Sequence, residues 1–350
     1  MGVDVNVWVT LLLVSCMAAE GFVGWWRATP VYRFADTVSD FVAGLVQLAV
    51  QAALGVSLVL IYTGFTRFAL FELPLSSPLA WGFAYLVTEL VLYWRHRAGH
   101  EIAALWAVHE VHHQSSEFNY AVGQRISVFQ WVQTALFVWP LALIGIPVPM
   151  FAALFGVIHF YNFLLHTKLI GQLGPLEHLL QTPALHRVHH GRNGEYIDKN
   201  YGFSITLYDR LFGTHQPEER PVDYGTTQPL PTYRMLHNHF APFAHLASRM
   251  RNAGSPRLAL EVALRHPGWD PATRALQLPA PGPAGPRVTP AAPVDGPRAA
   301  LAIGALLAGL VATLALTQLT PVLSWPARLA GGLVTAVLLG AATHFAPGDR

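Results

Sequence analysis

Histidine is concentrated in one part of this chain. Eleven of the 17 histidines lie between His96 and His190, and nine of these eleven form four short groups. The groups are His96 and His100; His109, His112 and His113; His166 alone; and His186, His189 and His190. Imidazole is the commonest metal ligand, and histidines three or four residues apart on a helix share a face. The pattern, with HxxHH occurring twice, predicts a metal centre built on helices.

The number of histidines indicates more than one ion. A protein-bound metal takes about four to six ligands, so nine imidazoles suit two metal ions close together. His109, His112 and His113 are expected on one face of a helix. On a straight helix His100 and His109 are about half a turn out of phase. The chain is therefore expected to bend between them, with Gly99 as the candidate position, or the two groups face different ions.

The remaining residue types limit the metal and the partners. Cys16 is the only cysteine, so neither a disulfide within the chain nor a CxxC metal or redox motif can form. Ligands limited to histidine and carboxylate suit iron or zinc and disfavour an iron–sulfur cluster. The net charge of +2 is too small to argue for a nucleic-acid partner.

The elements that position these histidines are expected to be membrane helices. The chain is 53% hydrophobic and only 12% charged, whereas soluble domains carry about 25% charged residues. A membrane span needs about 20 apolar residues. The expected spans are residues 5–26, 41–63, 79–95, 299–318 and 325–345, and residues 127–165 are expected to form two shorter passes joined by a turn at 145–149. The first span is interpreted as a retained helix in which Glu20 lies near the interface or faces protein.

Basic residues predict the orientation. Lys and Arg are enriched on the cytoplasmic side of membrane proteins, and here they flank the histidine groups: Arg95, Arg97, Arg125, Lys168, Arg187, Arg192 and Lys199. The expected fold is all-α, a polytopic integral membrane helical bundle with a cytoplasmic histidine-rich di-metal site. We divide the chain into N-terminal transmembrane helices (1–78), a catalytic core with a cytoplasmic region (79–267), a Pro/Ala/Gly-rich linker (268–297) and a C-terminal transmembrane pair (298–350), which we interpret as an anchor or lid.

The histidines outside the four groups are given structural roles. His159 is expected to be a hydrogen-bonded core residue. Surface or supporting positions around the ligands are expected for the others: His178, His215, His237, His239, His245 and His266.

Longer runs around the histidines resemble a known family. HRAGHEIAALWAVHEVHHQSSEFNYAVGQR (96–125), LGPLEHLLQTPALHRVHHGRN (173–193) and IDKNYGFSITLYDRLFGT (197–214) resemble the fatty acid hydroxylase or sterol desaturase superfamily, and within it the alkylglycerol monooxygenase branch. HPGWDPATR (266–274) resembles the C-terminal stretch of that branch. Two positions depart from the usual pattern: Gln114 stands where the family commonly has Ser, and Asn162 stands where some members have His.

The resemblance implies a membrane-bound non-haem di-iron oxygenase that uses O2 to hydroxylate a C–H bond of a membrane lipid. In the alkylglycerol branch that carbon adjoins the ether oxygen, the product separates into an aldehyde and glycerol, and tetrahydrobiopterin supplies electrons. Members of the branch carry a glutamate after HxxxH. It is Glu101 here, a candidate for catalysis and cofactor binding; the alternative is a solvated helix residue. Glu110, Asp198, Asn200 and Tyr201 are interpreted as residues that orient the ligands or, for the last three, as turn and capping residues.

Several alternatives stay open on the sequence alone. The substrate could be a sterol, a carotenoid or an amino-acid-containing lipid, and the reaction could be desaturation. The external electron donor could be a pterin, a cytochrome b5 or a ferredoxin, and zinc could occupy the site in the isolated protein. From other classes, a membrane metal transporter or buffer and a structural zinc protein remain, although ligands gathered at one end of the spans and the absence of an evident inverted repeat disfavour transport.

Overall fold

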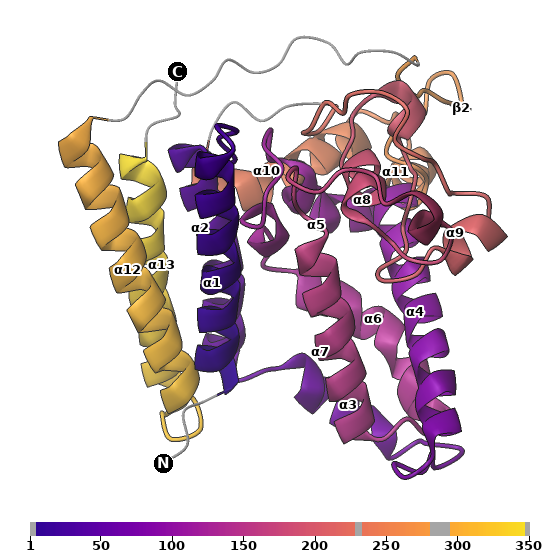
Figure 1. The fold of residues 1–350 in the computed structure, drawn as a ribbon, viewed down its shortest axis with the longest axis horizontal. Coiled ribbons are helices and arrows are strands. Elements are labelled where there is room, and N and C mark those ends of the chain that lie inside the picture. Colours follow the sequence, from indigo (N-terminus) through magenta and orange to yellow (C-terminus); the bar gives the residue numbers. More distant parts are fainter. Residues whose placement is uncertain (1–4, 228–232, 281–294, 347–350) are drawn as a thin grey trace.

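The computed structural model describes residues 5–227, 233–280 and 295–346, with the side chains of residues 5–7 excepted. It is almost entirely helical, as predicted (Figure 1). The elements are α1 Val5–Trp26, α2 Phe34–Leu54, α3 Leu58–Thr66, α4 Pro78–Glu101, α5 Ala103–His113, η1 Val122–Gln124, α6 Gln130–Leu143, α7 Val148–Leu164, η2 Gly174–His178, α8 Pro183–His189, η3 Gly194–Tyr196, α9 Leu207–Leu211, α10 Met235–Arg251, α11 Pro256–Leu264, β1 Trp269–Asp270, β2 Ala275–Leu276, α12 Gly296–Leu319 and α13 Trp325–Phe345.

The long helices form two packed groups. Helices α12 and α13 pack on each other and on α2, whereas α3, α4, α6 and α7 pack among themselves. Figure 1 shows the two groups side by side, with the shorter elements α5 and α8–α11 across one end of the second group. Those shorter elements carry most of the histidines, so one end of the helical layer holds the site.

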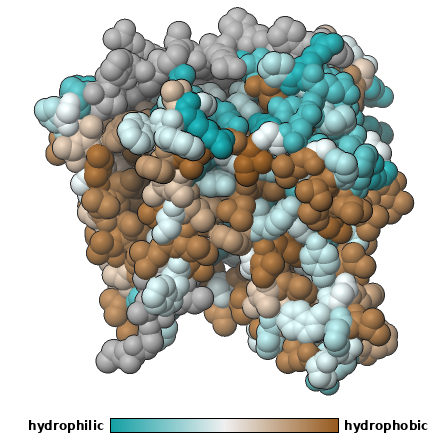
Figure 2. Space-filling view, in the orientation of Figure 1, coloured by the Kyte–Doolittle hydropathy of each residue, from teal (hydrophilic) through white to brown (hydrophobic). Residues whose placement is uncertain are grey.

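Four helices are long and apolar enough to cross a membrane in the described part of the chain. They are residues Trp8–Trp26, Phe34–Leu54, Gly296–Leu319 and Trp325–Phe345. Helix α7 is apolar but shorter. Figure 2 shows hydrophobic side chains over the long helices and hydrophilic ones gathered at the end that carries α8–α11. This distribution fits a membrane protein in which α5 and α8–α11 form a hydrophilic end outside the apolar layer. We call this end the polar cap.

The predicted span 41–63 is wrong, because the chain breaks inside it. Helix α2 begins earlier, at Phe34, and Gly55 ends it in the left-handed conformation (φ 64°) that glycine adopts without strain. Its amide donates to the carbonyls of Ala52 and Gln51. Ser57 then caps α3 by accepting from the Leu60 amide. Two helices, α6 and α7, occupy the region 127–165 where two shorter passes were predicted.

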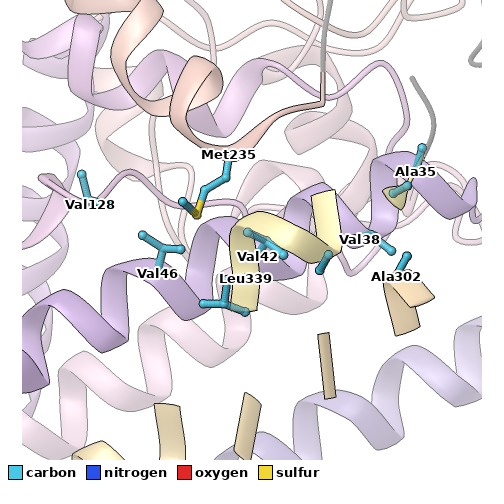
Figure 3. Close-up of a cluster of buried hydrophobic side chains, with 10 residues drawn as sticks. Ala35, Val38, Val42, Val46, Val128, Met235, Ala302 and Leu339 are labelled. Carbon is cyan, nitrogen blue, oxygen red and sulfur yellow. The ribbon is translucent and has the colours of Figure 1, made fainter. Parts of the chain in front are cut away.

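The C-terminal pair is fastened to the rest of the bundle by a hydrophobic cluster. Val42 and Val46 of α2 lie near Leu339 of α13 and Met235 of α10 (Figure 3). Val128, just before α6, joins the same cluster. The cluster therefore connects the helices on either side of the 281–294 segment, which itself lies outside the described residues.

The predicted linker 268–297 begins with ordered structure. Strands β1 and β2 form an antiparallel hairpin in which Trp269 pairs with Leu276 and Asp270 with Ala275. Trp269 is buried against Ala253 and Val262 of the α10–α11 region. The first part of this segment thus packs on the polar cap, while the division of the chain into four domains stays a prediction.

Candidate metal centre

The structure brings all nine predicted histidines together and divides them into two groups. The first group contains His96, His100, His109, His113 and His189, and the second contains His112, His166, His186 and His190. Within each group the candidate ligand atoms lie within 4.8 Å of one another. The rings of His113 and His190 stack with centroids 4.3 Å apart, so the two groups adjoin. The arrangement could hold two metal ions side by side.

The two HxxHH motifs each serve both groups. On α5, His109 and His113 face the first group, whereas His112 faces the second. On α8, His186 and its neighbour His190 face the second group, whereas His189 faces the first. The prediction that all three α5 histidines share one face is therefore too simple. On a helix, residues i+3 and i+4 lie on opposite sides of residue i. This angular difference directs His112 to one group and His113 to the other.

The predicted bend between His100 and His109 exists, but not at Gly99. Helix α4 continues through Glu101 and ends at Ile102, whose extended backbone (φ −121°, ψ 115°) also begins α5. Gly99 instead lies in a closely packed part of α4. A Cβ atom there would lie 2.9 Å from Nε2 of Gln133 and 3.5 Å from Cβ of His109.

Backbone carbonyls fix the orientation of four rings. The Nδ1 atoms of His96, His112, His166 and His189 lie 2.8 to 3.0 Å from the carbonyl oxygens of Tyr201, Arg125, Asn162 and Lys199. A carbonyl only accepts, so each Nδ1 carries the proton and each Nε2 presents a lone pair. This is the usual arrangement for histidine ligands whose second nitrogen is held by the protein.

The Nε2 atoms that face one another inside the histidine groups provide a test of whether the site fits a metal. Nε2 of His112 and Nε2 of His166 lie 3.3 Å apart although both are lone-pair atoms. The Nε2 atoms of His100, His189 and His190 are buried with no hydrogen-bond partner in the described part of the chain. Buried polar atoms without a partner cost free energy. A cation bound in each group would coordinate these nitrogens and remove that cost.

Burial favours the ligand form of these rings. Desolvation lowers the pKa of His109, His112, His113, His186, His189 and His190 well below the ordinary value, and the neighbouring imidazoles lower it further. The pKa of His166 falls to about 4 for the same first reason. Neutral imidazole is the form that binds metal.

The DKNYG segment (198–202) contacts three candidate ligands of the first group. Its Lys199 and Tyr201 carbonyls hold His189 and His96, and its Asp198 carboxylate lies 3.6 Å from Nδ1 of His100. Asp198 and Asn200 adopt positive φ values of 60° and 54°, a conformation that Asp and Asn tolerate better than most residues. The segment therefore turns the chain and contacts three candidate ligands, and its role in orienting them stays a prediction.

Buried polar residues hold the same segment in place. Asp209 accepts from the amides of Tyr201 and Gly202 at 2.7 and 2.8 Å and from Oγ1 of Thr214. A Cβ at Gly202 would lie 2.4 Å from the Ile205 carbonyl oxygen, so only glycine fits there. The conspicuous DRLFGT motif (209–214) thus holds the segment that contacts the candidate ligands, and it belongs to neither histidine group.

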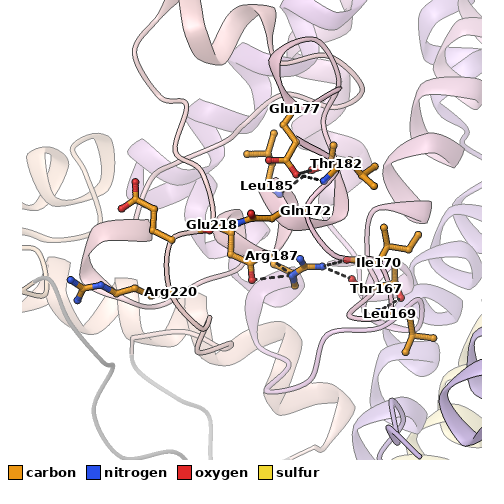
Figure 4. Close-up of polar contacts among 12 residues, drawn as sticks. Thr167, Leu169, Ile170, Gln172, Glu177, Thr182, Leu185, Arg187, Glu218 and Arg220 are labelled. Atoms are coloured by element: carbon orange, nitrogen blue, oxygen red, sulfur yellow. Dashed lines mark hydrogen bonds and ion pairs between the residues drawn. The ribbon is translucent and has the colours of Figure 1, made fainter. Parts of the chain in front are cut away.

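Arg187, inside the second HxxHH motif, anchors α8. Its guanidinium donates to the carbonyls of Thr167 and Ile170 and to the carboxylate of Glu218 (Figure 4). The Thr167 contact ties α8 directly to the residue after His166. Arg187 thereby fixes the second histidine group between two chain segments.

A cavity of about 670 Å³ opens beside the first histidine group. His100, His113 and His189 form part of its wall, with Trp106 and Glu110 of α5 next to them. Burial raises the pKa of Glu110 to about 7. Residues of α10 and of the 266–279 segment complete the wall, so the cavity lies on the polar cap and not among the long apolar helices.

Glu101 lies apart from both features. Its carboxylate pairs with Nε of Arg97 at 2.9 Å, one turn earlier on α4, and about a third of its side chain is exposed. It is among neither the histidine groups nor the residues lining the cavity. Its predicted role in catalysis or cofactor binding stays a prediction.

Residues outside the motifs also shape the centre. His159 is a core residue, as predicted, with Nδ1 bonded to the Phe155 carbonyl. Arg95 was grouped with the loop cations, yet it is buried in α4 and donates to Oγ1 of Thr134 on α6. Arg125 is buried in an ion pair with Asp40 of α2. His239 was expected on the surface or beside the ligands, and its burial in α10 rules out the surface position. Apart from His159, these residues belong to no repeated spacing pattern, so the sequence did not indicate their positions.

Comparison with known proteins identifies a family over the part of the chain that carries the histidine groups. Residues 81–214 match the fatty acid hydroxylase family model. This part of the chain is a fatty acid hydroxylase domain. All nine histidines and the DKNYG segment lie inside the matched range. No solved structure matches the chain.

Similarity to individual proteins extends beyond this domain. The chain is 36% identical over 264 residues to the alkylglycerol monooxygenase of Danio rerio, covering 75% of this chain and 59% of that protein. It is 34% identical over 271 residues to the alkylglycerol monooxygenase of Homo sapiens, covering 77% and 61%. The ornithine lipid hydroxylase of Rhizobium tropici is 34% identical over 148 residues, covering 41% and 44%. The chain spans about three fifths of the alkylglycerol monooxygenases of Danio rerio and Homo sapiens.

Proposed function

We propose that this protein is a membrane-bound lipid monooxygenase with two metal ions, most specifically iron, in the two histidine groups. The observation that carries the proposal is the pair of adjoining groups of inward-facing, unprotonated imidazole nitrogens. Histidine-rich sites with open positions suit non-haem iron, and bound iron would supply activation of O2 for attack on a C–H bond. The balanced reaction is lipid C–H plus O2, two electrons and two protons, giving lipid C–OH and water.

The protein's own residues perform the positioning. The apolar helices below the histidine groups would hold the alkyl chain of a lipid, with its head group near the polar cap. Backbone carbonyls at residues 125, 162, 199 and 201 keep four imidazoles in the metal-binding tautomer. Burial keeps water away from the centre.

We propose alkylglycerol ether lipids as the substrate, with hydroxylation next to the ether oxygen. The support is 34–36% identity to alkylglycerol monooxygenases over about three quarters of this chain. An ornithine lipid is the second candidate, because an ornithine lipid hydroxylase matches part of the same region. Desaturation stays a third outcome of the same centre.

The decisive experiment is metal analysis of the purified protein combined with aerobic turnover of a labelled alkylglycerol. We expect about two irons per chain and release of a fatty aldehyde when tetrahydrobiopterin is present. Iron with turnover of an ornithine lipid alone would replace the substrate proposal. Absence of metal from active protein would overturn the proposal as a whole.

We propose further that the electron donor is a small reduced heterocycle, such as tetrahydrobiopterin, bound in the cavity beside the first group. Its volume of about 670 Å³ lies in the ordinary range for small-molecule sites. Trp106 offers a flat face, and Glu110 offers an acceptor for ring N–H groups. A cytochrome b5 or a ferredoxin would instead have to dock outside the cavity.

Glu110→Gln is expected to raise the KM for tetrahydrobiopterin about 10-fold, because a charge-assisted hydrogen bond in a buried site contributes about 1.5–3 kcal/mol. The measurement is initial rate against pterin concentration. The matched control is Glu72→Gln at an exposed loop position, which should leave this KM unchanged. Glu101→Gln tests the sequence-based candidate in the same assay: an unchanged KM and kcat would remove Glu101 from the site.

We also propose that the histidine groups face the cytoplasm. Three of the cations that predicted this orientation, Arg95, Arg125 and Arg187, are buried in internal contacts and therefore do not contribute to it. Arg27, Arg33 and Lys199 remain as exposed or half-buried cations near the polar cap. A cysteine introduced at Lys199 should be labelled by an impermeant thiol reagent only from the cytoplasmic side of sealed vesicles.

A further inference from the structure

His266 lies 52 residues beyond the matched hydroxylase domain, yet it contacts Asp198 beside the first histidine group. Its Nε2 lies 2.7 Å from Oδ2 of Asp198. On the other side of the ring, the Gly268 amide donates to Nδ1 at 2.9 Å. An amide N–H needs a lone pair at Nδ1, so the proton resides on Nε2 and is donated to the carboxylate.

The second oxygen of Asp198 faces a candidate ligand. Oδ1 lies 3.6 Å from Nδ1 of His100, whose other nitrogen, Nε2, is buried in the first histidine group and has no hydrogen-bond partner among the described residues. A carboxylate beside the outer nitrogen of a histidine fixes the ring and its tautomer for metal binding. Gly268, His266, Asp198 and His100 thus form a continuous chain that ends at the first group.

The polar cap holds His266 firmly. Arg249 of α10 donates to the carbonyls of Pro267 and Trp269, both at 2.6 Å. The Ala103 amide, at the start of α5, donates to the carbonyl of Arg265 at 2.8 Å. The ring of Trp269 lies under the Arg265 guanidinium, 4.9 Å from its centre. Backbone on both sides of His266 is therefore fixed to the helices that carry the site.

We propose that His266 is a positioning residue of the first metal site, acting through Asp198 on His100. The proposal rests on the proposed di-metal centre. It assigns the segment after the hydroxylase domain a role in metal binding, in addition to closing one wall of the cavity. The second histidine group contains no residue held by this chain of contacts, so only one of the two ions depends on it.

The test uses His266→Phe, which keeps a flat ring without its nitrogens, and His266→Gln, whose terminal amide can donate to Asp198. Metal affinity is measured by competition with a chelator, counting the ions retained per chain. Loss of a partner that orients a ligand typically costs about 10–100-fold in metal affinity. His266→Phe is expected to weaken the binding of one ion by this factor and to leave the affinity for the other ion unchanged. His266→Gln should retain most of the affinity for both ions. Asp198→Asn should resemble His266→Phe.

The control is His245→Phe, a cavity-lining histidine on α10 that has no contact with Asp198 among the described residues. It should bind both ions as the unaltered protein does. Thermal unfolding of the metal-free proteins identifies any variant that fails to fold. Wild-type affinity for both ions in a folded His266→Phe protein, or equal weakening of both ions, would overturn the inference. If the unaltered protein binds no metal, the proposed function fails instead.

Discussion

Replacing His112 with alanine is expected to remove one of two bound ions and to lower lipid turnover by more than about 100-fold. Even residues that only orient a ligand change metal affinity or activity by about 10–100-fold, and His112 is a candidate ligand. Its Nε2 faces that of His166 at 3.3 Å, and its Nδ1 is already occupied by the Arg125 carbonyl. No neighbouring ring nitrogen on α5 is free to replace it, because His109 and His113 face the first group.

Metal content per chain and turnover of the labelled lipid measure this result. His178→Ala is the matched control: this exposed histidine contacts Arg210 and belongs to neither group. It should keep both ions and full activity. Unchanged turnover in a well-expressed His112→Ala protein would show that the histidine groups are not the catalytic centre.

Replacing Arg125 with alanine is expected to destabilise the protein by about 3–5 kcal/mol, the usual cost of removing one partner of a buried ion pair. The guanidinium lies inside a polar network between α2, α5 and α10, and its loss leaves the Asp40 carboxylate buried without a cation. It donates to four other chain positions: Val111, Ser39, Asp40 and Gln114.

The measurement is thermal unfolding in detergent, compared with Arg33→Ala. Arg33 also forms an ion pair, with Glu117 at 2.6 Å, but 49% of its side chain is exposed. Exposed pairs contribute only about 0–1 kcal/mol, so this control should unfold close to the unaltered protein. Equal midpoints for the two variants would contradict the importance assigned to the buried network.

Gln114 explains one departure from the family pattern. Its Oε1 accepts from Arg125 and its Nε2 donates to the Asn238 carbonyl at 2.9 Å. Serine at this position would be too short to bridge α5 and α10 in this way. The glutamine therefore belongs with the buried arginine, and neither one indicates a change in the metal centre.

Sequence predicted the site better than the scaffold around it. Spacing singled out eight of the nine histidines that the structure brings together, because helical periodicity and metal chemistry both act over three or four residues, whereas His166 stands alone in the sequence. Their division into two groups depends on how α5 and α8 approach each other, which no local pattern encodes. Glu20 was expected at an interface or facing protein, and it faces protein, accepting from Tyr32 and from the Tyr120 amide.

The missed features share a physical cause. His266 and Asp198 are 68 residues apart in the chain, so only tertiary packing joins them. The break at Gly55 was hidden by apolar residues on both sides, although Ser57 two residues later is an ordinary helix cap. Hydrophobicity detected the membrane layer but not where one helix ended within it.

Because the two histidine groups share two helices, each bound ion would be a cross-link between the same pair of helices. An ion in the first group would join α5 to α8 through His109, His113 and His189, and an ion in the second group would join them through His112, His186 and His190. Either ion alone would therefore hold α5 against α8 after loss of the other. Hydrogen exchange of the α5 and α8 amides should consequently rise sharply only when both ions are removed.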